Sequence, residues 1–355
     1  MIKLQDGFVV GFVMGSSKKI GEGKKIRIGI ALTFGILTKE SGYSIQMTKG
    51  LERAKRELGL DVLEYDVRVP SIPVTDEEVM ETLTEFAETK KYDLIFAQGV
   101  AMGPPVVSVA PKYPEQKFAV IDGTYGYPKI PNVATYIAKN EEAGFLRGYM
   151  LALITKTNVI GTIYGSDDYC IMRWIAATIA GAKYFDTKIK VLYAVVGSWT
   201  NPYKAEKLAS LMYDYGADVV HTHADITGDV GSLRAAQKRN RYLIGLPREL
   251  DPEHTLWNGF RRMDDLLLDA IRSVVEGTFR AETFAYGLKE NHIGPILEDT
   301  HPLVTDDVKV KAETMKRRLM ANEISLPMTK KQQLQQLRKG REIVWHPKWH
   351  SELHS

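Results

Sequence analysis

The stretch VVGSWTNPYKAEKLASLMYDYGADVVHTHAD, residues 195–225, reads in turn as strand, loop, helix and strand. Val195 and Val196 close one apolar run, and ADVVHTHA (217–224) is the next. Between them, apolar residues recur at helical spacing at Ala205, Leu208, Ala209, Leu211, Met212 and Tyr215. Strands that alternate with helices in this way are typical of a parallel sheet.

The same alternation continues on both sides of this stretch. Continuous apolar runs predict two series of strands, at 26–32, 61–67, 93–99 and 117–123, and then at 158–165, 190–197, 218–224 and 242–247. Helical patterns lie between most of them, at 43–58, 76–90, 141–155, 171–185, 203–215 and 229–239. Apolar strands of this kind are covered by helices on both faces. The sequence therefore predicts an α/β protein with two Rossmann-like lobes of similar design.

The chain is expected to cross between these lobes several times. The first lobe is expected to end near PNVATYIAKNEEAG (131–144), yet a helix at 261–276 and a strand at 281–288 follow the second series. They are too few for a third lobe, so they should return to the first two. We expect an N-terminal arm at 1–25 and a first lobe made of 26–137 and 248–278. The second lobe should comprise 138–247 and 279–325, and a basic helix or tail should follow at 326–355.

Composition narrows the class of protein. The chain has 355 residues and a net charge of +3, which does not suggest nucleic acid as a partner. Cys170 is the single cysteine, so neither an intramolecular disulfide nor a cysteine-based zinc site is expected. The apolar run GFVVGFVMG (7–15) is too short to span a bilayer and lacks a following lipidation cysteine. It fits an extra strand, a loose arm or the remnant of a signal peptide.

Polar and aromatic residues gather where the predicted strands end. In doubly wound sheets, ligands bind beyond the carboxyl ends of the strands. These ends carry Thr33–Phe34, Gln98, Asp122, Ser166–Asp168, Ser198–Trp199, Asp225 and Arg248–Glu249. Such a set would suit a flat ring with polar edges. Trp199 reads either as a stacking wall or as a packing residue. Each polar position also has a local alternative: a turn cap at Asp122, a helix N-cap at Asp225, and a solvated pair at Arg248 and Glu249.

Signatures of catalysis are weak. The sequence contains no Walker-type phosphate loop and no G-x-S-x-G elbow, and GEG (21–23) precedes the first strand instead of following it. His221 and His223 alternate on one predicted strand and would share a face, but two histidines do not make a metal site. His346, His350 and His354 are expected in a tail. We therefore expect a non-enzymatic protein without a cofactor.

Several motifs together resemble the basic-membrane-protein family of type I periplasmic binding proteins, which includes purine nucleoside receptors of ABC transporters. The resemblance covers about residues 26–325. It rests on NVATYIAKNEEAGFLRGYMLALITKTNVIGTIYG (132–165), GSWTNPYKAEKLASLMYDYGADVV (197–220) and LWNGFRRMDDLLLDAIRSVVEGTFRAETFAYGLKEN (256–291). It implies a two-lobed solute-binding protein that closes on a small molecule between its lobes, with an ABC permease as partner and an extracytoplasmic location.

The resemblance also implies ligand-binding residues. Tyr43 in GYSIQMTKGL would stack on the ligand, with Trp199 facing it or walling the cleft. The remaining candidates are Phe34, Asp122, Trp174, Asn201, Asp225, Arg248 and Arg261.

Departures from the family pattern bear on the ligand. Nucleoside-binding members carry an aspartate where this chain has Thr33–Phe34 and another where it has Pro247, and Arg261 replaces a lysine. The GYS-x-Q and LWN stretches are closer to the branch that binds a free base such as adenine. The expected ligand is a purine-like base or nucleoside, or a similar flat heterocycle. The alternatives are a cytoplasmic or membrane-associated sensor that regulates a partner and, less favoured, a nucleoside-processing enzyme.

Overall fold

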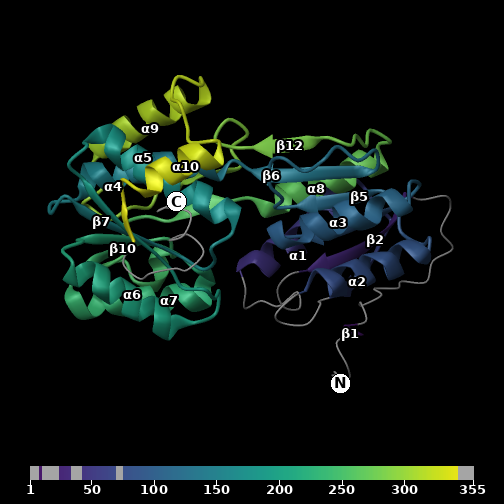
Figure 1. Ribbon diagram of the computed structural model, residues 1–355, viewed down its shortest axis with the longest axis horizontal. Coiled ribbons are helices and arrows are strands. Elements are labelled where there is room, and N and C mark those ends of the chain that lie inside the picture. The colour runs from purple at the N-terminus through teal and green to yellow at the C-terminus, as the bar shows by residue number, and fades with distance from the viewer. Residues whose placement is uncertain (1–7, 10–23, 33–41, 69–74, 343–355) are drawn as a thin grey trace. The chain divides into compact units, whose positions relative to one another are not determined.

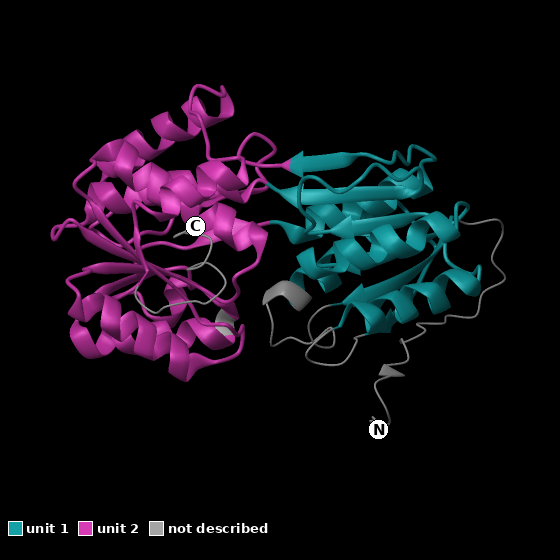
Figure 2. Cartoon of the chain, viewed as in Figure 1, with its two compact units in different colours: residues 1–138, 262–285 teal, residues 139–261, 286–355 magenta. Residues whose placement is uncertain are grey.

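The computed structural model describes residues 8–9, 24–32, 42–68 and 75–342. Within them, the stretch that opened the sequence analysis forms the expected succession of elements (Figure 1). Strand β8 (Lys190–Val195) is followed by helix α6 (Pro202–Asp214), strand β9 (Val219–His223) and helix α7 (Asp225–Arg239). The chain divides into two compact units, 1–138 with 262–285 and 139–261 with 286–355 (Figure 2).

Unit 2 is built on a five-stranded sheet of order β10-β9-β7-β8-β14, in which every neighbouring pair is parallel. Its other strands are β7 (Val159–Tyr164), β10 (Tyr242–Ile244) and β14 (Arg341–Glu342). A separate antiparallel pair joins β11 (Gly259–Arg261) to β13 (Ile293–Pro295). Its remaining helices are α4 (Asn140–Ile154), α5 (Tyr169–Phe185), α9 (Asp306–Met320), α10 (Lys330–Leu337) and a short turn at Arg248–Leu250.

Both faces of this sheet are covered. Along β8, Val191 and Tyr193 belong to one apolar core with α4 and α5, whereas Leu192 and Ala194 belong to the other core with α6 and α7. Successive side chains of a strand point to opposite faces, so a strand covered on both faces is apolar throughout. This confirms the parallel α/β architecture that the apolar runs predict.

Unit 1 has the same plan. Its seven-stranded sheet has the order β1-β3-β2-β4-β5-β6-β12, in which β1 is antiparallel to β3. These strands are β1 (Phe8–Val9), β2 (Lys25–Leu32), β3 (Val62–Arg68), β4 (Leu94–Gln98), β5 (Phe118–Ile121), β6 (Val133–Ala138) and β12 (Thr283–Tyr286). The helices are α1 (Gly42–Glu57), α2 (Asp76–Glu88), α3 (Gly103–Val109) and α8 (Met263–Val275), with short turns at Val100–Met102 and Ala110–Lys112.

Ion pairs tie the returning segment into unit 1. Arg53 on α1 lies 2.6 Å from a carboxylate oxygen of Asp264 and 2.6 Å from one of Asp265, both on α8.

The chain returns to unit 1 at residue 262 and leaves it at 285. The sequence predicts that the chain returns to the first lobe near residue 248 and leaves it near residue 278. The structure therefore differs for 248–261, which lie in unit 2, and for 279–285, which lie in unit 1.

The C-terminal segment is part of unit 2 where it is described. Leu337 on α10 is fully buried in the core that contains α5, and β14 adds a parallel edge strand to β8. The expectation of an appended helix and tail is thus corrected up to residue 342. His346, His350 and His354 lie outside the described residues.

Helices α4 and α5 pack unusually closely. A Cβ atom added at Gly148 would lie 1.9 Å from the carbonyl oxygen of Thr178, and one at Gly181 would lie 1.9 Å from that of Phe145. At Gly144 it would meet the Trp174 ring at 2.7 Å. The backbones approach each other only because these three positions lack side chains. A buried ion pair, Arg173 Nε to Glu141 Oε2 at 3.0 Å, joins the same two helices.

Gly148→Ala is expected to destabilise unit 2 by about 2 kcal/mol or more, because the new methyl group must push α4 away from α5. The tryptophans within the described residues, Trp174, Trp199 and Trp257, belong to unit 2, so urea unfolding followed by tryptophan fluorescence reports on that unit. Lys207→Ala, on the exposed face of α6, is the control and should change the free energy of unfolding by less than about 0.5 kcal/mol. Equal stabilities for the two variants would contradict the close contact.

A buried carboxyl group, Asp229 on α7, holds the turn after β9. It accepts hydrogen bonds from Thr222 Oγ1 at 2.5 Å and from the Ala224 backbone N at 2.7 Å. Burial raises the pKa of Asp229 to about 7. The folded chain therefore keeps a proton here that the unfolded chain releases near pH 4.

The contribution of Asp229 to the free energy of unfolding therefore falls as the pH rises from about 4 to 7, and it is constant above that range. Asp229→Asn removes the titration. The difference in unfolding free energy between the variant and the parent should shift in favour of the variant by ~1.4 kcal/mol per pH unit up to about pH 7. Urea titrations at pH 5.5, 6.5, 7.5 and 8.5 measure this difference, and a flat profile would show that Asp229 is already ionised at pH 5.5.

Candidate functional site

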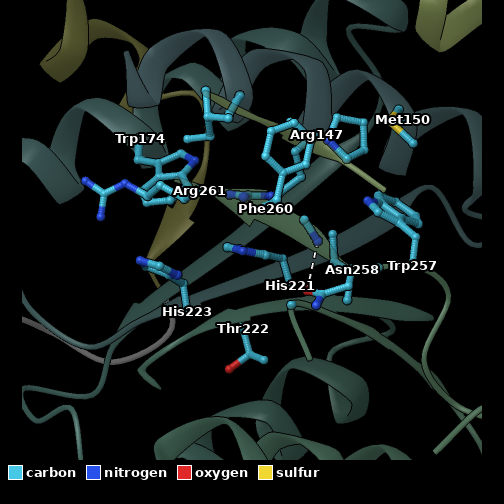
Figure 3. Close-up of a pocket in the computed structure, with 17 residues that line it drawn as sticks. Arg147, Met150, Trp174, His221, Thr222, His223, Trp257, Asn258, Phe260 and Arg261 are labelled. Carbon is cyan, nitrogen blue, oxygen red and sulfur yellow. Dashed lines mark hydrogen bonds between the residues drawn. The ribbon is translucent and has the colours of Figure 1, made fainter. Parts of the chain in front are cut away.

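A cavity of about 100 Å³ lies within unit 2, bounded by α4, α5, β9, the end of β10 and the β11–β13 pair. This volume is well above the ~10–15 Å³ that one buried water needs. Figure 3 shows Trp174, Phe260 and Trp257 along one side, and His223, His221 and Thr222 along the other. One side of the cavity therefore carries aromatic rings, and the opposite side carries hydrogen-bonding groups.

Backbone geometry forms the end of the cavity beside β10. Gly245 follows β10 with a φ of 113°, and a Cβ atom there would lie 2.1 Å from the Thr222 carbonyl oxygen. Only glycine fits such a close approach at a positive φ. This lets the chain turn away directly after the strand and leaves the face of β9 open to the cavity.

Trp174 is the centre of the aromatic wall. It is 3% exposed, and its ring centroid lies 4.4 Å from that of His223. Its indole Nε1–H has no hydrogen-bond acceptor among the residues that the structure describes. A buried donor without an acceptor costs free energy, so an acceptor atom of a bound molecule would be stabilised beside it.

His221 and His223 share one face of β9, as their alternation predicts, with ring centroids 6.3 Å apart. His221 Nδ1 lies 2.9 Å from Thr162 Oγ1. Burial lowers the pKa of both rings well below 6.5, and the charge of Arg147 lowers the two pKa values further. Both histidines are therefore neutral at pH 7, and each ring carries one nitrogen that donates and one that accepts.

Two arginines lie beside Trp174. The Arg147 guanidinium carbon is 4.8 Å from the Trp174 ring centroid and that of Arg261 is 5.8 Å away. Arg147 also donates to Tyr164 Oη at 3.5 Å. Burial lowers the pKa of Arg147, yet a guanidinium stays protonated at neutral pH. The cavity thus combines aromatic surface, neutral imidazoles and fixed positive charge.

Two of the nine residues predicted to bind ligand, Trp174 and Arg261, line this cavity together. Trp199 lies next to it: its ring packs over Gly165 and meets His223 edge to face at 5.8 Å. Trp199 is half-buried against the core of unit 2, so both of its alternatives, wall and packing residue, keep support.

The other predicted residues lie elsewhere or have local partners. Asn201 caps α6 by accepting the Lys204 backbone N–H at 3.0 Å, and Asp225 is the first residue of α7, with Ala224 in the cap position. Arg248 pairs with Asp299 at 3.0 Å in place of Glu249, and also donates to the carbonyls of Pro252 and Thr255.

Three predicted residues belong to unit 1. Asp122 follows β5 there, half-buried at a φ of 60°. Phe34 and the side chain of Tyr43 lie outside what the structure describes.

Sequence reasoning missed Arg147, Trp257, Asn258 and Phe260 as lining residues. Arg147 had a visible signal, since it is a single charge in the apolar helical run FLRGYMLALI. Trp257 and Asn258 belong to the LWN motif and Phe260 follows it, but only the tertiary structure brings them to the cavity beside β9. Among described residues, no cluster of three or more His, Cys, Asp or Glu side chains could hold a metal ion.

Comparison with known proteins bears on the whole chain. Residues 29–330 match the family described as "ABC transporter substrate-binding protein PnrA-like". An uncharacterized lipoprotein of Pyrococcus abyssi is 29% identical over 302 residues, which cover 81% of this chain and 72% of the relative. Basic membrane protein D of Borreliella burgdorferi is 23% identical over 338 residues, with coverages of 93% and 96%.

A solved structure shows the same fold. The ABC transporter solute-binding protein of Aeropyrum pernix K1 superposes with a TM-score of 0.74 at 22% identity, covering 93% of this chain and 96% of the other. In the part of the chain that the structure describes, no helix has the length and hydropathy to cross a membrane. The type I periplasmic binding protein fold predicted from the sequence is confirmed, and the chain belongs to the PnrA-like family of ABC transporter substrate-binding proteins.

Proposed function

We propose that the protein captures a purine-like base or nucleoside, or a similar flat heterocycle, and that the cavity of unit 2 forms one wall of the binding site. The observation that carries the proposal is the buried Trp174 indole, whose N–H lacks an acceptor in the described structure. Aromatic faces suit a planar ring, and a few polar groups read its edge.

Neighbouring groups support a heterocycle over an aliphatic solute. Trp257 and Phe260 add aromatic surface, and neutral His221 and His223 offer both donors and acceptors to ring nitrogens and carbonyls. Asn258 supplies an amide at the same cavity, although its Oδ1 accepts the Gly259 N–H at 2.8 Å. The contacts expected from Phe34, Tyr43, Asp122, Trp199, Asn201, Asp225 and Arg248 remain predictions.

Trp174→Leu should weaken ligand binding by about 10- to 100-fold, because it removes both the aromatic surface and the indole N–H while keeping an apolar side chain. Isothermal titration calorimetry with adenine, guanine, hypoxanthine and their nucleosides measures the effect. Tyr203→Ala is the matched control, since Tyr203 is an 81% exposed aromatic of the same unit, and it should bind like the parent.

Melting temperatures of the empty variants separate a loss of fold from a loss of contact. If no base, nucleoside or other flat heterocycle binds to the parent at millimolar concentration, the proposed ligand class is wrong. Unchanged affinity in a folded Trp174→Leu variant would remove the cavity from the binding site.

We also propose that the protein works at the outer face of the membrane and passes its ligand to an ABC permease. Relatives named lipoprotein and basic membrane protein support this location. The native protein should be recovered with membranes and be digested by protease added to intact cells. Recovery in the cytosol, protected from protease, would instead favour the sensor that the sequence also allows.

A further inference from the structure

Arg147 occupies a setting that is unusual for a cation. It lies on α4, is half-buried, and lines the cavity (Figure 3). Its contacts are the Trp174 ring at 4.8 Å and Tyr164 Oη at 3.5 Å, both of which are uncharged. No carboxylate of the described residues forms an ion pair with Arg147. A half-buried charge that is partly withdrawn from water without a counter-charge costs free energy.

Two other arginines that are buried or partly buried have carboxylate partners. Arg173, fully buried on the adjacent helix, lies 3.0 Å from Glu141, and Arg53 lies 2.6 Å from each of two aspartates. Arg147 differs from both of these arginines. A cation without an ion-pair partner at the wall of a cavity indicates that the bound ligand supplies the negative charge.

The surroundings add positive charge and no negative charge. Arg261 lies 5.8 Å from the same Trp174 ring, and the 17 lining residues include no aspartate or glutamate. His221 and His223 are neutral and offer no compensation. The formally charged residues that line the cavity are therefore both positive, Arg147 and Arg261.

We propose that the bound solute is a planar heterocyclic acid whose anionic oxygen binds Arg147, with Arg261 contributing to the same positive field. This inference rests on the proposed function, because it names the charge of the ligand held by the same cavity. A guanidinium presents parallel N–H donors that match carboxylate-like oxygens, and such charge-assisted hydrogen bonds are about twice as strong as neutral ones. Oxygen-rich purines that ionise near neutral pH and ring-bound carboxylates meet this requirement, whereas adenine does not.

Calorimetry at pH 7.5 with a matched panel tests the charge of the ligand. Urate and orotate represent planar acids, adenine and hypoxanthine represent neutral rings, and inorganic phosphate represents charge without a ring. We expect at least one planar acid to bind about 10-fold or more tightly than both neutral rings, and phosphate to bind only weakly.

Arg147→Met keeps the volume of the side chain and removes its charge. It should weaken binding of the planar acid by about 10- to 100-fold, change binding of neutral rings by less than about threefold, and leave the melting temperature of the empty protein unchanged or raised. Arg234→Met is the control, because Arg234 is an arginine of α7 that pairs with Glu206 outside the cavity. It should leave acid binding unchanged.

The outcomes separate this inference from the proposed function. Neutral rings that bind as tightly as the acids would overturn the inference and leave the proposed function standing. An acid that binds the parent and the Arg147→Met variant equally would also overturn it, as would a lower melting temperature with unchanged affinity, which identifies a structural arginine. Failure of every ring compound to bind would overturn both.

Discussion

The close contact of α4 with α5 is the constraint on which the cavity of unit 2 depends. Gly144, Gly148 and Gly181 let the two backbones approach to a distance at which no other residue fits. That approach brings Arg147 of one helix over the indole of Trp174 on the other. The buried pair of Glu141 and Arg173 joins the same helices and leaves them little freedom to slide. Binding groups held on rigid helices are placed more accurately than groups on loops.

Electrostatics then gives this rigid frame its chemical character. Two arginines stand beside one tryptophan, and burial keeps the two facing histidines neutral. The positive charge of Arg147 favours the neutral form of His221, because two positive charges close together repel each other. A neutral imidazole can still donate and accept hydrogen bonds. The cavity therefore combines charges of one sign with both donors and acceptors of hydrogen bonds.

Membership of the PnrA-like substrate-binding family and the geometry of the cavity bear on different aspects of function. Family membership establishes the general role of solute capture, which a shared fold alone would not do. The identity of the solute depends on side chains at one place, and there this chain departs from the pattern of the nucleoside-binding members. Carboxylates expected after two strands are missing from the sequence, and arginines line the described cavity. If this cavity forms the binding site, fewer acids and more fixed cations would both favour a negatively charged ligand, as we propose.

By itself, the sequence determined the α/β class, the two similar units and most elements, because apolar periodicity is a local property. The run at 190–197 became β8, and the helical spacing at 203–215 became α6, each within two residues of its expected ends. It also singled out Trp174 and Arg261, which line the same cavity, and placed His221 and His223 on one face of a strand. Only the tertiary structure decided that 248–261 belongs to unit 2, that α10 and β14 complete that unit, and that Arg147 faces Trp257, Phe260 and the histidines. The reason is physical: a strand or helix is encoded by neighbouring residues, whereas a cavity is formed by backbones that approach from distant positions. Here that approach depends on glycines whose role appears only when the opposing helix or strand is in place.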